Sequence, residues 1–335
     1  SKKKFFLCST FLSSETKVEN IDKKKENKGY CMKIIGTGSA LPSLSVSNDM
    51  LSTFLDTSDE WISTRTGVKK RRILSTETLV DLAAIAAEKA LENAGLAATD
   101  IDYILCSNLV NIYATPSFSS IIQGRIGAAC PCLDLNVACS GFVYALDIAD
   151  AFLQTGKTKN VLIICAEEPS RIVDWTERDA SILFGDGAAA AVLTTGDDLK
   201  AIHLSTTSNI ESLYYQRKLE FNPFMKRKEY GRPLVMNGKE IYRLAVLNSI
   251  ADIDFVLEKS GIKKEDVKFF ILHQANMRII EAIRQNMDQP QEKFPHNLEN
   301  YGNTASASIP ILLDELNKSN QLNNGDFLIL SAFGA

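Results

Sequence analysis

The sequence is short of the features that mark membrane proteins, metal sites and nucleic-acid binders. No apolar run approaches the roughly 18 residues that a membrane-spanning helix needs. Only three histidines are present, and they lie far from Cys130-Pro131-Cys132, a pair too tight for the usual zinc knuckle. The 37 basic residues are outnumbered by 41 acidic ones, which gives a net charge of −4. We therefore expect no membrane, no metal and no nucleic-acid partner.

The chain also lacks a disulfide framework. Its seven cysteines are an odd number without disulfide-like spacing, which favours a reducing compartment. Apolar residues make up 45% and charged residues 23% of the 335 positions, as in an ordinary globular protein. This length suits one large α/β unit or two closely packed halves.

Residues 1–31 differ from the remainder of the chain. They are rich in Lys, Ser and Asn, and show no usable periodicity. The apolar stretch at 5–12 is too short to span a membrane. Two interpretations stay open: a disordered tail, or a targeting leader of the kind that directs import into a plastid-type organelle (apicoplast or plastid stroma). The second half of the segment carries acidic residues that weaken the leader interpretation, and a bacterial cytoplasm is the alternative location.

From residue 32 on, strand and helix patterns alternate. The first half, 32–200, predicts strands at 33–38, 101–106, 132–137 and 161–165 and helices at 78–94, 116–127 and 141–155. The second half, 201–335, predicts strands at 201–205, 269–272 and 327–331 and helices at 238–260, 278–286 and 307–316. Residues 208–230 are polar and basic, and we expect an irregular insertion or flap. The pattern predicts two similar α/β halves with mostly parallel sheets, which suggests an internal duplication.

Three polar residues lie near the starts of helices. Cys139 follows one predicted strand, His273 follows another, and Asn303 lies in a loop that opens a helix. Because ligand sites form at the carboxyl ends of strands in open α/β sheets, we expect the three to converge. A helix start also stabilises a thiolate, so we expect Cys139 to be a nucleophile rather than a buried core residue.

The three residue types form a coherent set for acyl chemistry. A thiolate can attack a thioester, while an imidazole N–H and a carboxamide NH2 group can hold an enolate oxygen. Taken singly, His273 could be a structural histidine and Asn303 a turn residue beside Gly302. Taken together, the three indicate a covalent acyl transfer site.

Six motifs in the same order resemble those of β-ketoacyl-acyl-carrier-protein synthase III, the initiating condensing enzyme of type II fatty-acid synthesis. The resemblance covers the chain from about residue 33 to its end. The matching segments are IGTGSALP at 35–42, TSDEWISTRTG at 57–67, ACSGF at 138–142, FGDGA at 184–188, HQAN at 273–276 and YGNT at 301–304.

The resemblance implies the thiolase fold, with two duplicated halves in a five-layered αβαβα sandwich, and a homodimer. It implies that Cys139 accepts the acetyl group of acetyl-CoA and that CoA leaves. His273 and Asn303 would then hold the enolate formed as malonyl-acyl carrier protein loses CO2, and attack on the thioester would give acetoacetyl-acyl carrier protein. The oxyanion hole would use the backbone N–H groups of Cys139 and Ala335, and no cofactor is implied beyond CoA thioester substrates.

Further positions carry over by the same resemblance. The matched residues are Trp61, Arg65, Arg171, Gly238 and Asn276 for CoA, Thr115 and Phe333 for the acyl pocket, and Arg243 and Arg278 for docking of the acidic carrier protein. The basic run at 69–72 is either a solvated face or a site that favours the 3′-phosphate of CoA.

Two departures from the family pattern bear on these expectations. The family continues past the position of Ala335 with a closing strand of the second half, which is missing here. The partner-subunit position that closes the acyl pocket, often aromatic, falls on Thr115, which leaves room for longer or branched acyl-CoA starters. A related condensing enzyme with such a starter is therefore the main alternative; a Cys139–His273 hydrolase and a non-catalytic thiolase-fold binding subunit are weaker ones.

Overall fold

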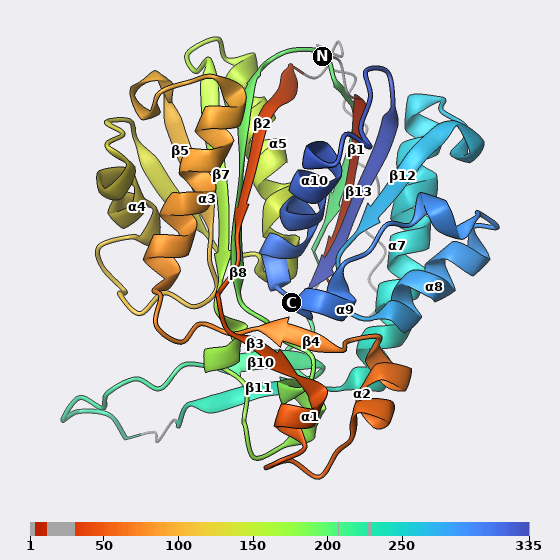
Figure 1. Ribbon diagram of the computed structural model, residues 1–335. Helices are drawn as coiled ribbons and strands as arrows, with labels where there is room; N and C mark the ends of the chain where they lie inside the picture. The colour runs from red at the N-terminus through yellow and green to blue at the C-terminus, as the bar shows by residue number, and fades with distance from the viewer. Residues whose placement is uncertain (1–3, 12–30, 207, 227–229, 335) are drawn as a thin grey trace.

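The computed structural model describes residues 4–11, 31–206, 208–226 and 230–334. Two β-sheets stand side by side with a pair of helices between them and further helices on their outer faces (Figure 1). The order of the layers is helices, sheet, helices, sheet, helices. The five-layered αβαβα arrangement implied by the sequence resemblance is therefore confirmed.

The first sheet has five strands in the order β2-β8-β7-β5-β6. The strands β5, β6 and β7 are parallel, whereas β8 runs antiparallel to both of its neighbours. Their bounds are Met32–Ala40 for β2, Gly187–Thr195 for β8, Asn160–Glu167 for β7, Tyr103–Ser107 for β5 and Cys132–Leu135 for β6. The parallel strands end at the same edge, and this edge carries the turn of Cys139.

The second sheet repeats this order with one strand fewer, β9-β1-β13-β12. Its strands are β9 (Leu199–Ser205), β1 (Lys4–Phe11), β13 (Phe327–Gly334) and β12 (Val267–Leu272). The strand β1 therefore takes the place that β8 has in the first sheet. It runs parallel to β13 and β9, opposite to the direction of β8 in its own sheet.

This placement of β1 differs from the expectation for the beginning of the chain. The sequence interpretation assigned residues 1–31 to a leader or irregular tail, yet Lys4–Phe11 pairs with two strands of the second sheet. This segment lies between β9 and β13 in the second sheet. Strand pairing satisfies the backbone N–H and C=O groups that β9 and β13 would otherwise expose to each other. The remainder of the leader prediction, at 1–3 and 12–30, lies outside the described residues.

The helices form three layers, and each layer has its own apolar cluster. The outer layer on the first sheet is α3 (Leu79–Ala94) and α4 (Phe118–Ile126). Between the sheets lie α5 (Gly141–Gln154) and α10 (Ser308–Lys318), whose apolar side chains pack with strands of both sheets. The outer layer on the second sheet is α7 (Gly238–Ser260) and α8 (Met277–Asn286). Capping residues read from the sequence fix several ends: Thr78 begins α3, and left-handed Gly95 and Gly261 end α3 and α7.

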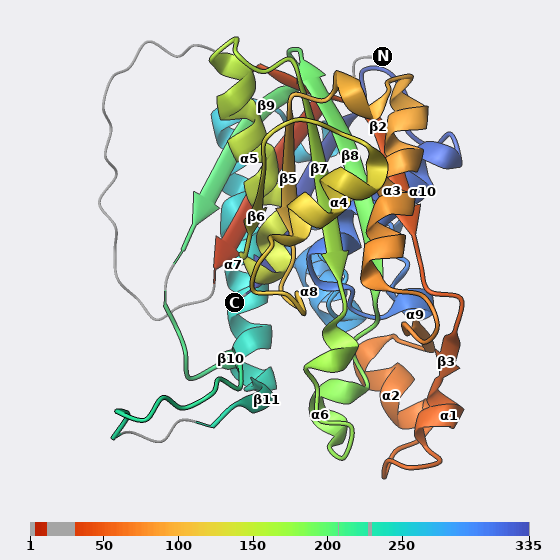
Figure 2. The ribbon, with the colours of Figure 1, turned by 90° about the vertical axis from the view of Figure 1, so that its left-hand side faces the viewer.

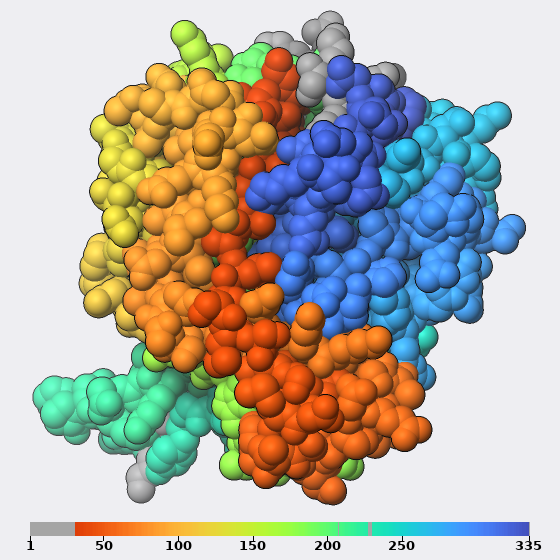
Figure 3. Space-filling model, in the orientation of Figure 1, coloured from red at the N-terminus to blue at the C-terminus, as the bar shows by residue number. Residues whose placement is uncertain are grey.

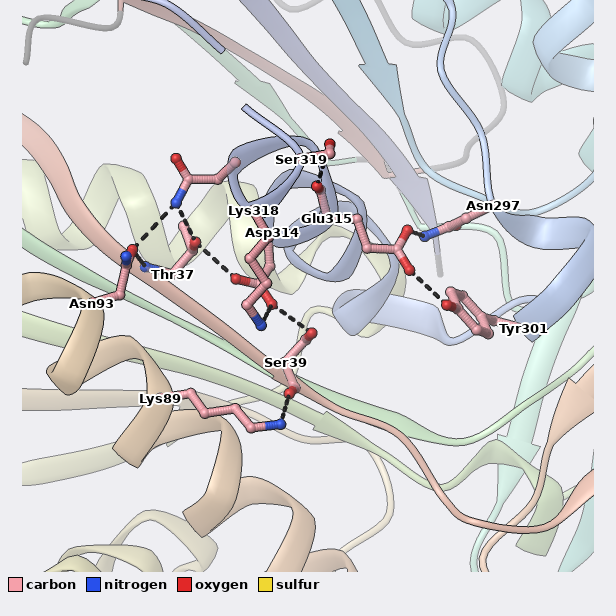
Figure 4. Close-up of polar contacts among 11 residues, drawn as sticks. Thr37, Ser39, Lys89, Asn93, Asn297, Tyr301, Asp314, Glu315, Lys318 and Ser319 are labelled. Carbon is pink, nitrogen blue, oxygen red and sulfur yellow. Dashed lines mark hydrogen bonds and ion pairs between the residues drawn. The ribbon is translucent and has the colours of Figure 1, made fainter. Parts of the chain in front are cut away.

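Buried polar contacts fix α10 against the first sheet and against the loop before it (Figure 4). The carboxylate of Asp314 accepts hydrogen bonds from Thr37 Oγ1 at 2.9 Å and from Ser39 Oγ at 2.6 Å, both on β2. On the next position of the helix, Glu315 accepts hydrogen bonds from the Tyr301 hydroxyl at 2.6 Å and from Asn297 Nδ2 at 2.8 Å. Carboxylates that are buried, as in Asp314, or half-buried, as in Glu315, need such partners, and those of Glu315 hold the segment before Asn303 in place.

Small elements gather below the two sheets, at the end where the site lies (Figure 2). They include α1 (Asn48–Leu51), α2 (Asp59–Thr66), α6 (Arg178–Ser181), α9 (Leu298–Tyr301) and the short pair β3 (Ser45–Ser47) and β4 (Lys70–Arg72). The expected irregular insertion is partly regular: Leu213–Gln216 forms β10 and pairs antiparallel with β11 (Arg232–Met236). This β-ribbon projects from the body of the molecule (Figure 3). Among the described residues, no helix is both long and apolar enough to cross a membrane.

Candidate active site

Cys139, His273 and Asn303 line one cavity of about 1050 Å³. They come from three separate junctions of the chain: the turn after β6, the end of β12 and the loop after α9. Phe333 and Gly334, at the end of β13, line the same cavity. The structure therefore brings together the three residues that the sequence singled out.

Cys139 sits in a tight turn ahead of α5 rather than inside the helix. The preceding residue, Ala138, has φ +43°, a left-handed conformation that costs a non-glycine residue energy. Burial, followed by the charge of Glu167, raises the pKa of the Cys139 thiol to about 12. The expected lowering of this pKa by the helix start is thus wrong for the free enzyme, because desolvation outweighs it.

His273 is buried and held at both ends. Its backbone N–H donates to Ser331 O at 2.8 Å, and its Nδ1 lies 2.7 Å from Ser308 Oγ. The imidazole meets the ring of Phe333 edge-on, with centroids 5.3 Å apart. Burial lowers the pKa of His273 to about 3, so the ring is neutral at pH 7 and can offer one N–H to a ligand.

Asn303 is oriented by its own loop. Its Oδ1 accepts the backbone N–H of Ala305 at 2.9 Å, and its backbone N–H donates to Leu183 O at 2.8 Å. Because the side-chain oxygen is engaged, the NH2 group is the part that can donate into the cavity. Gly302 allows this geometry: it has φ +68°, and a Cβ there would lie 2.6 Å from Leu183 O.

Outside the residues that line the cavity, cationic and aromatic side chains form a stack. The guanidinium carbon of Arg65 lies 4.3 Å from the centre of the Trp61 ring, and that of Arg178 lies 4.5 Å from it. Such stacking is the mode in which proteins bind flat aromatic ligands. The sequence interpretation included Trp61 and Arg65 but missed Arg178, which no spacing rule connects to Trp61.

The other residues assigned to CoA fall into two groups. Gly238 and Asn276 line the cavity, and Asn276 Nδ2 donates to the backbone oxygen of Arg65 at 3.2 Å. Arg171 instead lies 3.7 Å from the carboxylate of Glu168 and does not line the cavity. The structure thus places Gly238 and Asn276 at the cavity and links Asn276 to Arg65, whereas Trp61, Arg65 and Arg171 are not among the lining residues.

The remaining assigned residues lie at the surface or beyond the described range. Arg243 is paired with Glu240 at 2.8 Å, and the guanidinium of Arg278 lies 5.9 Å from the ring of Tyr242 at the cavity mouth. Thr115 is exposed and does not line this chain's cavity. Ala335, the expected second oxyanion donor, lies outside the described residues.

The basic run at 69–72 is not uniform. Lys69 and Lys70 are exposed, whereas Arg71 is neither exposed to solvent nor available to a phosphate. Arg71 is fully buried, and its guanidinium donates to Asn48 Oδ1 at 2.8 Å and Ile182 O at 2.7 Å. Desolvation lowers the pKa of Arg71 to about 10, which still leaves it charged at pH 7. Arg71 is therefore a structural cation, which links α1 to the segment that follows α6.

The arrangement is suited to covalent acyl transfer followed by stabilisation of an enolate. It combines a thiol, a neutral imidazole and an oriented carboxamide around one cavity. Within the described residues, no cluster of three or more His, Cys, Asp or Glu side chains is arranged to hold a metal ion.

Comparisons with known proteins agree with this geometry. Sequence models of 3-oxoacyl-(acyl-carrier-protein) synthase III match residues 133–209, and models of its C-terminal part match residues 257–335. A β-ketoacyl-(acyl-carrier-protein) synthase III of Clostridium acetobutylicum is 40% identical over 308 residues, which cover 90% of this chain and 95% of that protein.

Solved structures are similar as well. The 3-oxoacyl-(acyl-carrier-protein) synthase III of Aquifex aeolicus has a TM-score of 0.78 and 40% identity, covering 91% of this chain and 96% of its own. A priming β-ketosynthase from a polyketide biosynthetic pathway has a TM-score of 0.80 and 32% identity, covering 92% and 94%.

Proposed function

The chain belongs to the 3-oxoacyl-(acyl-carrier-protein) synthase III family, and from its site we propose how it performs the initiating condensation of fatty-acid synthesis. The enzyme is an acyl-transferring condensing enzyme of the thiolase fold. Its substrates are acetyl-CoA and malonyl-acyl carrier protein, and its products are acetoacetyl-acyl carrier protein, CoA and CO2.

In the first half-reaction, Cys139 becomes acetylated. Its sulfur forms a bond to the acetyl carbonyl carbon, the carbon–sulfur bond to CoA breaks, and the thiol proton leaves with the CoA thiol. The oxyanion that forms on the way is held by backbone N–H groups, those of Cys139 and Ala335. Gly334 supports this role, because its lack of a side chain lets the end of β13 approach Cys139.

In the second half-reaction, His273 and Asn303 stabilise the enolate. The malonyl group loses CO2, and the electrons of the broken bond form an enolate on the carrier-bound thioester. The Asn303 NH2 group and the N–H of the neutral His273 donate to the enolate oxygen. The enolate carbon then bonds to the acetyl carbonyl carbon, the bond from this carbon to the Cys139 sulfur breaks, and the thiolate takes up one proton from solvent to restore the thiol.

Ser308 supports the required tautomer of His273. Its Oγ accepts the backbone N–H of Gln274 at 3.3 Å, so its own hydrogen can be donated to His273 Nδ1, 2.7 Å away. The imidazole proton then resides on Nε2, where it can donate to the enolate. A buried neutral His273 can donate this hydrogen bond without first taking up a proton from solvent.

The nucleotide end of CoA would bind beside Trp61. The guanidinium groups of Arg65 and Arg178 lie over the indole and can pair with phosphate oxygens or stack on adenine. Gly238 and Asn276 line the path along which pantetheine would reach Cys139. The acidic carrier protein would approach the same mouth past Arg243 and Arg278. Arg171, which the sequence pattern also assigned to CoA, is the weaker candidate because Glu168 already pairs with it.

A longer or branched acyl-CoA starter is the second candidate substrate. Phe333 lines the cavity beside His273, and Thr115 of a partner subunit would close the far end of an acyl pocket in a homodimer. A threonine there leaves more room than an aromatic side chain. A panel of acyl-CoAs of increasing length, each tested for acylation of Cys139, distinguishes acetyl from longer starters.

The observation that carries the proposal is the convergence of Cys139, His273 and Asn303 in one cavity. Intact-mass spectrometry after incubation with acetyl-CoA should show one acetyl adduct, which peptide mapping assigns to Cys139. The variants His273→Ala and Asn303→Ala should still acquire it but lose malonyl decarboxylation. An adduct on another cysteine, or normal decarboxylation in both variants, would refute these roles.

Location and assembly remain proposals of ours. The composition of residues 1–31 is the ground for proposing import into a plastid-type organelle, and the pairing of Lys4–Phe11 within the second sheet counts against a leader that includes this segment. A bacterial cytoplasm is the alternative. Fusing residues 1–31 to a fluorescent protein tests import. Analytical ultracentrifugation of the full chain tests the homodimer, and a monomeric enzyme with full activity would exclude a contribution of Thr115 from a partner.

A further inference from the structure

The two halves present equivalent turns to each other at the centre of the molecule. In the first half, left-handed Ala138 (φ +43°) opens a short 3-10 turn that leads into α5. In the second half, left-handed Ala305 (φ +47°) opens the corresponding turn that leads into α10. By this correspondence, Ser306 is the counterpart of Cys139.

The strand ends that face these two turns also correspond, and here the halves differ. The strand β13 ends at Gly334, which packs against Cys139, and β7 ends at Glu167, which packs against Ser306. The glycine lets the backbone of β13 approach Cys139 closely, whereas in the other half a carboxyl group lies against Ser306 at the corresponding strand end.

Glu167 is buried and held from two sides. It is 1% exposed, its Oε1 lies 2.5 Å from Ser306 Oγ, and its Oε2 accepts the backbone N–H of Leu109 at 3.0 Å. Gly141, the first residue of α5, packs directly on Ser306 and on Ser107 of β5. Glu167 therefore links the Asn303 loop to the strands beneath the nucleophile, without lining the substrate cavity.

Three thiols lie within reach of the charge of Glu167. Burial is the main cause that raises the pKa of Cys139, Cys106 on β5 and Cys165 on β7, and the charge of Glu167 raises each of them further. The neighbouring Glu168 instead pairs with Arg171. Burial raises the pKa of Glu167 itself to about 8, although its hydrogen bonds from Ser306 and Leu109 oppose this.

We propose that Glu167 is a positioning residue of the nucleophile, which holds the Ser306 turn beside Cys139 as an uncharged acid and opposes thiolate formation when it ionises. At neutral pH most of the Glu167 carboxyl groups carry a proton and add no negative charge to the surroundings of Cys139. Above about pH 8 the carboxylate forms, and a like charge nearby disfavours the Cys139 thiolate. The role of Glu167 in catalysis rests on the proposed function of Cys139. The electrostatic coupling between Glu167 and the Cys139 thiol does not depend on that function.

The test is the pH profile of Cys139 alkylation by iodoacetamide, followed by mass spectrometry of the Cys139 peptide. The full-length enzyme is compared with Glu167→Gln, which keeps the shape and removes the charge. We expect the variant to react about tenfold faster than wild type at pH 9.5 and within about twofold of it at pH 6.5. Parallel profiles for the two proteins would overturn the proposal.

Two further variants keep the result interpretable. Glu168→Gln removes the adjacent carboxylate, which faces Arg171, and should reproduce the wild-type profile. Ser306→Ala keeps the charge of Glu167 but removes a hydrogen bond that favours its ionisation, so the inflection should move to higher pH. An unchanged inflection in Ser306→Ala contradicts the coupling even if Glu167→Gln fails to fold. Alkylation needs neither acetyl-CoA nor carrier protein, so a missing acetyl adduct would count against the proposed function alone.

Discussion

A Cβ atom on Gly334 would lie 2.9 Å from both the backbone nitrogen and the Cβ of Cys139. Side-chain carbons are essentially never found so close to backbone atoms, so the last residue of β13 must be glycine for the strand to reach the nucleophile. The contact joins the two halves at the residue that carries the nucleophile, because Cys139 belongs to the first half and Gly334 to the second.

Gly334→Ala should therefore impair acetylation of Cys139 by about 100-fold or more, since it displaces the backbone around the oxyanion site. The measurement is the rate of acetyl adduct formation by intact-mass spectrometry. Gly124→Ala is the matched control, because a Cβ there meets nothing within 4 Å, and it should acetylate normally. Normal acetylation of Gly334→Ala would show that this close approach is not needed.

Ser308→Ala should separate the two half-reactions. It removes the hydroxyl 2.7 Å from His273 Nδ1, so the proton is no longer confined to Nε2. We expect malonyl decarboxylation to fall about 10- to 100-fold while Cys139 acetylation stays within about twofold. Ser319→Ala, at the exposed end of the same helix, should leave both steps unchanged. Equal losses in both half-reactions would point to a general structural defect instead.

His273 should make the protein less stable in mild acid. Its pKa is about 3 in the folded protein and near 6.5 when unfolded, so the unfolded chain binds the proton first as the pH falls. The contribution is fully present above pH 6.5 and is lost progressively down to about pH 3. Between pH 7 and pH 5 it amounts to about 2 kcal/mol. Urea unfolding of wild type and His273→Gln at the two pH values measures it, and an identical pH effect in both proteins would contradict it.

Arg178→Ala should weaken CoA binding with little effect on the chemical step. Loss of one guanidinium from the Trp61 stack is expected to raise KM for acetyl-CoA about tenfold while kcat changes by less than about threefold. Arg171→Ala is the comparison, since Arg171 pairs with Glu168 and should alter KM by less than about threefold. A larger effect at Arg171 than at Arg178 would restore the assignment drawn from the sequence pattern.

The sequence predicted the regular elements well where local signals were strong. The helix at 238–260 was predicted with its observed bounds, because Gly261 ends it in a left-handed conformation. The ribbon formed by β10 and β11 was missed, since its strands are short and stabilised by pairing rather than by their own pattern. The strand β1 was missed for a related reason, because its partners lie at positions 199–205 and 327–334.

The candidate site divides in the same way. Cys139, His273 and Asn303 could be found because each lies near a helix start and their chemistry is complementary. Glu167 carried a different signal in the sequence, because it is an acid at the end of an otherwise apolar strand. Only the tertiary structure shows that this acid contacts Ser306. Arg178 carried no signal, because its stacking partner Trp61 is remote in the sequence.

Residue types and their order along the chain were enough to predict most helices and strands and to single out Cys139, His273 and Asn303, because periodicity, caps and side-chain chemistry are local properties of the chain. The family and the layered fold were implied by the resemblance of six motifs to the synthase III family. The protonation preferences of Cys139, His273 and Glu167 came only from the tertiary structure, because burial and neighbouring charges shift pKa values and neither is written in local sequence.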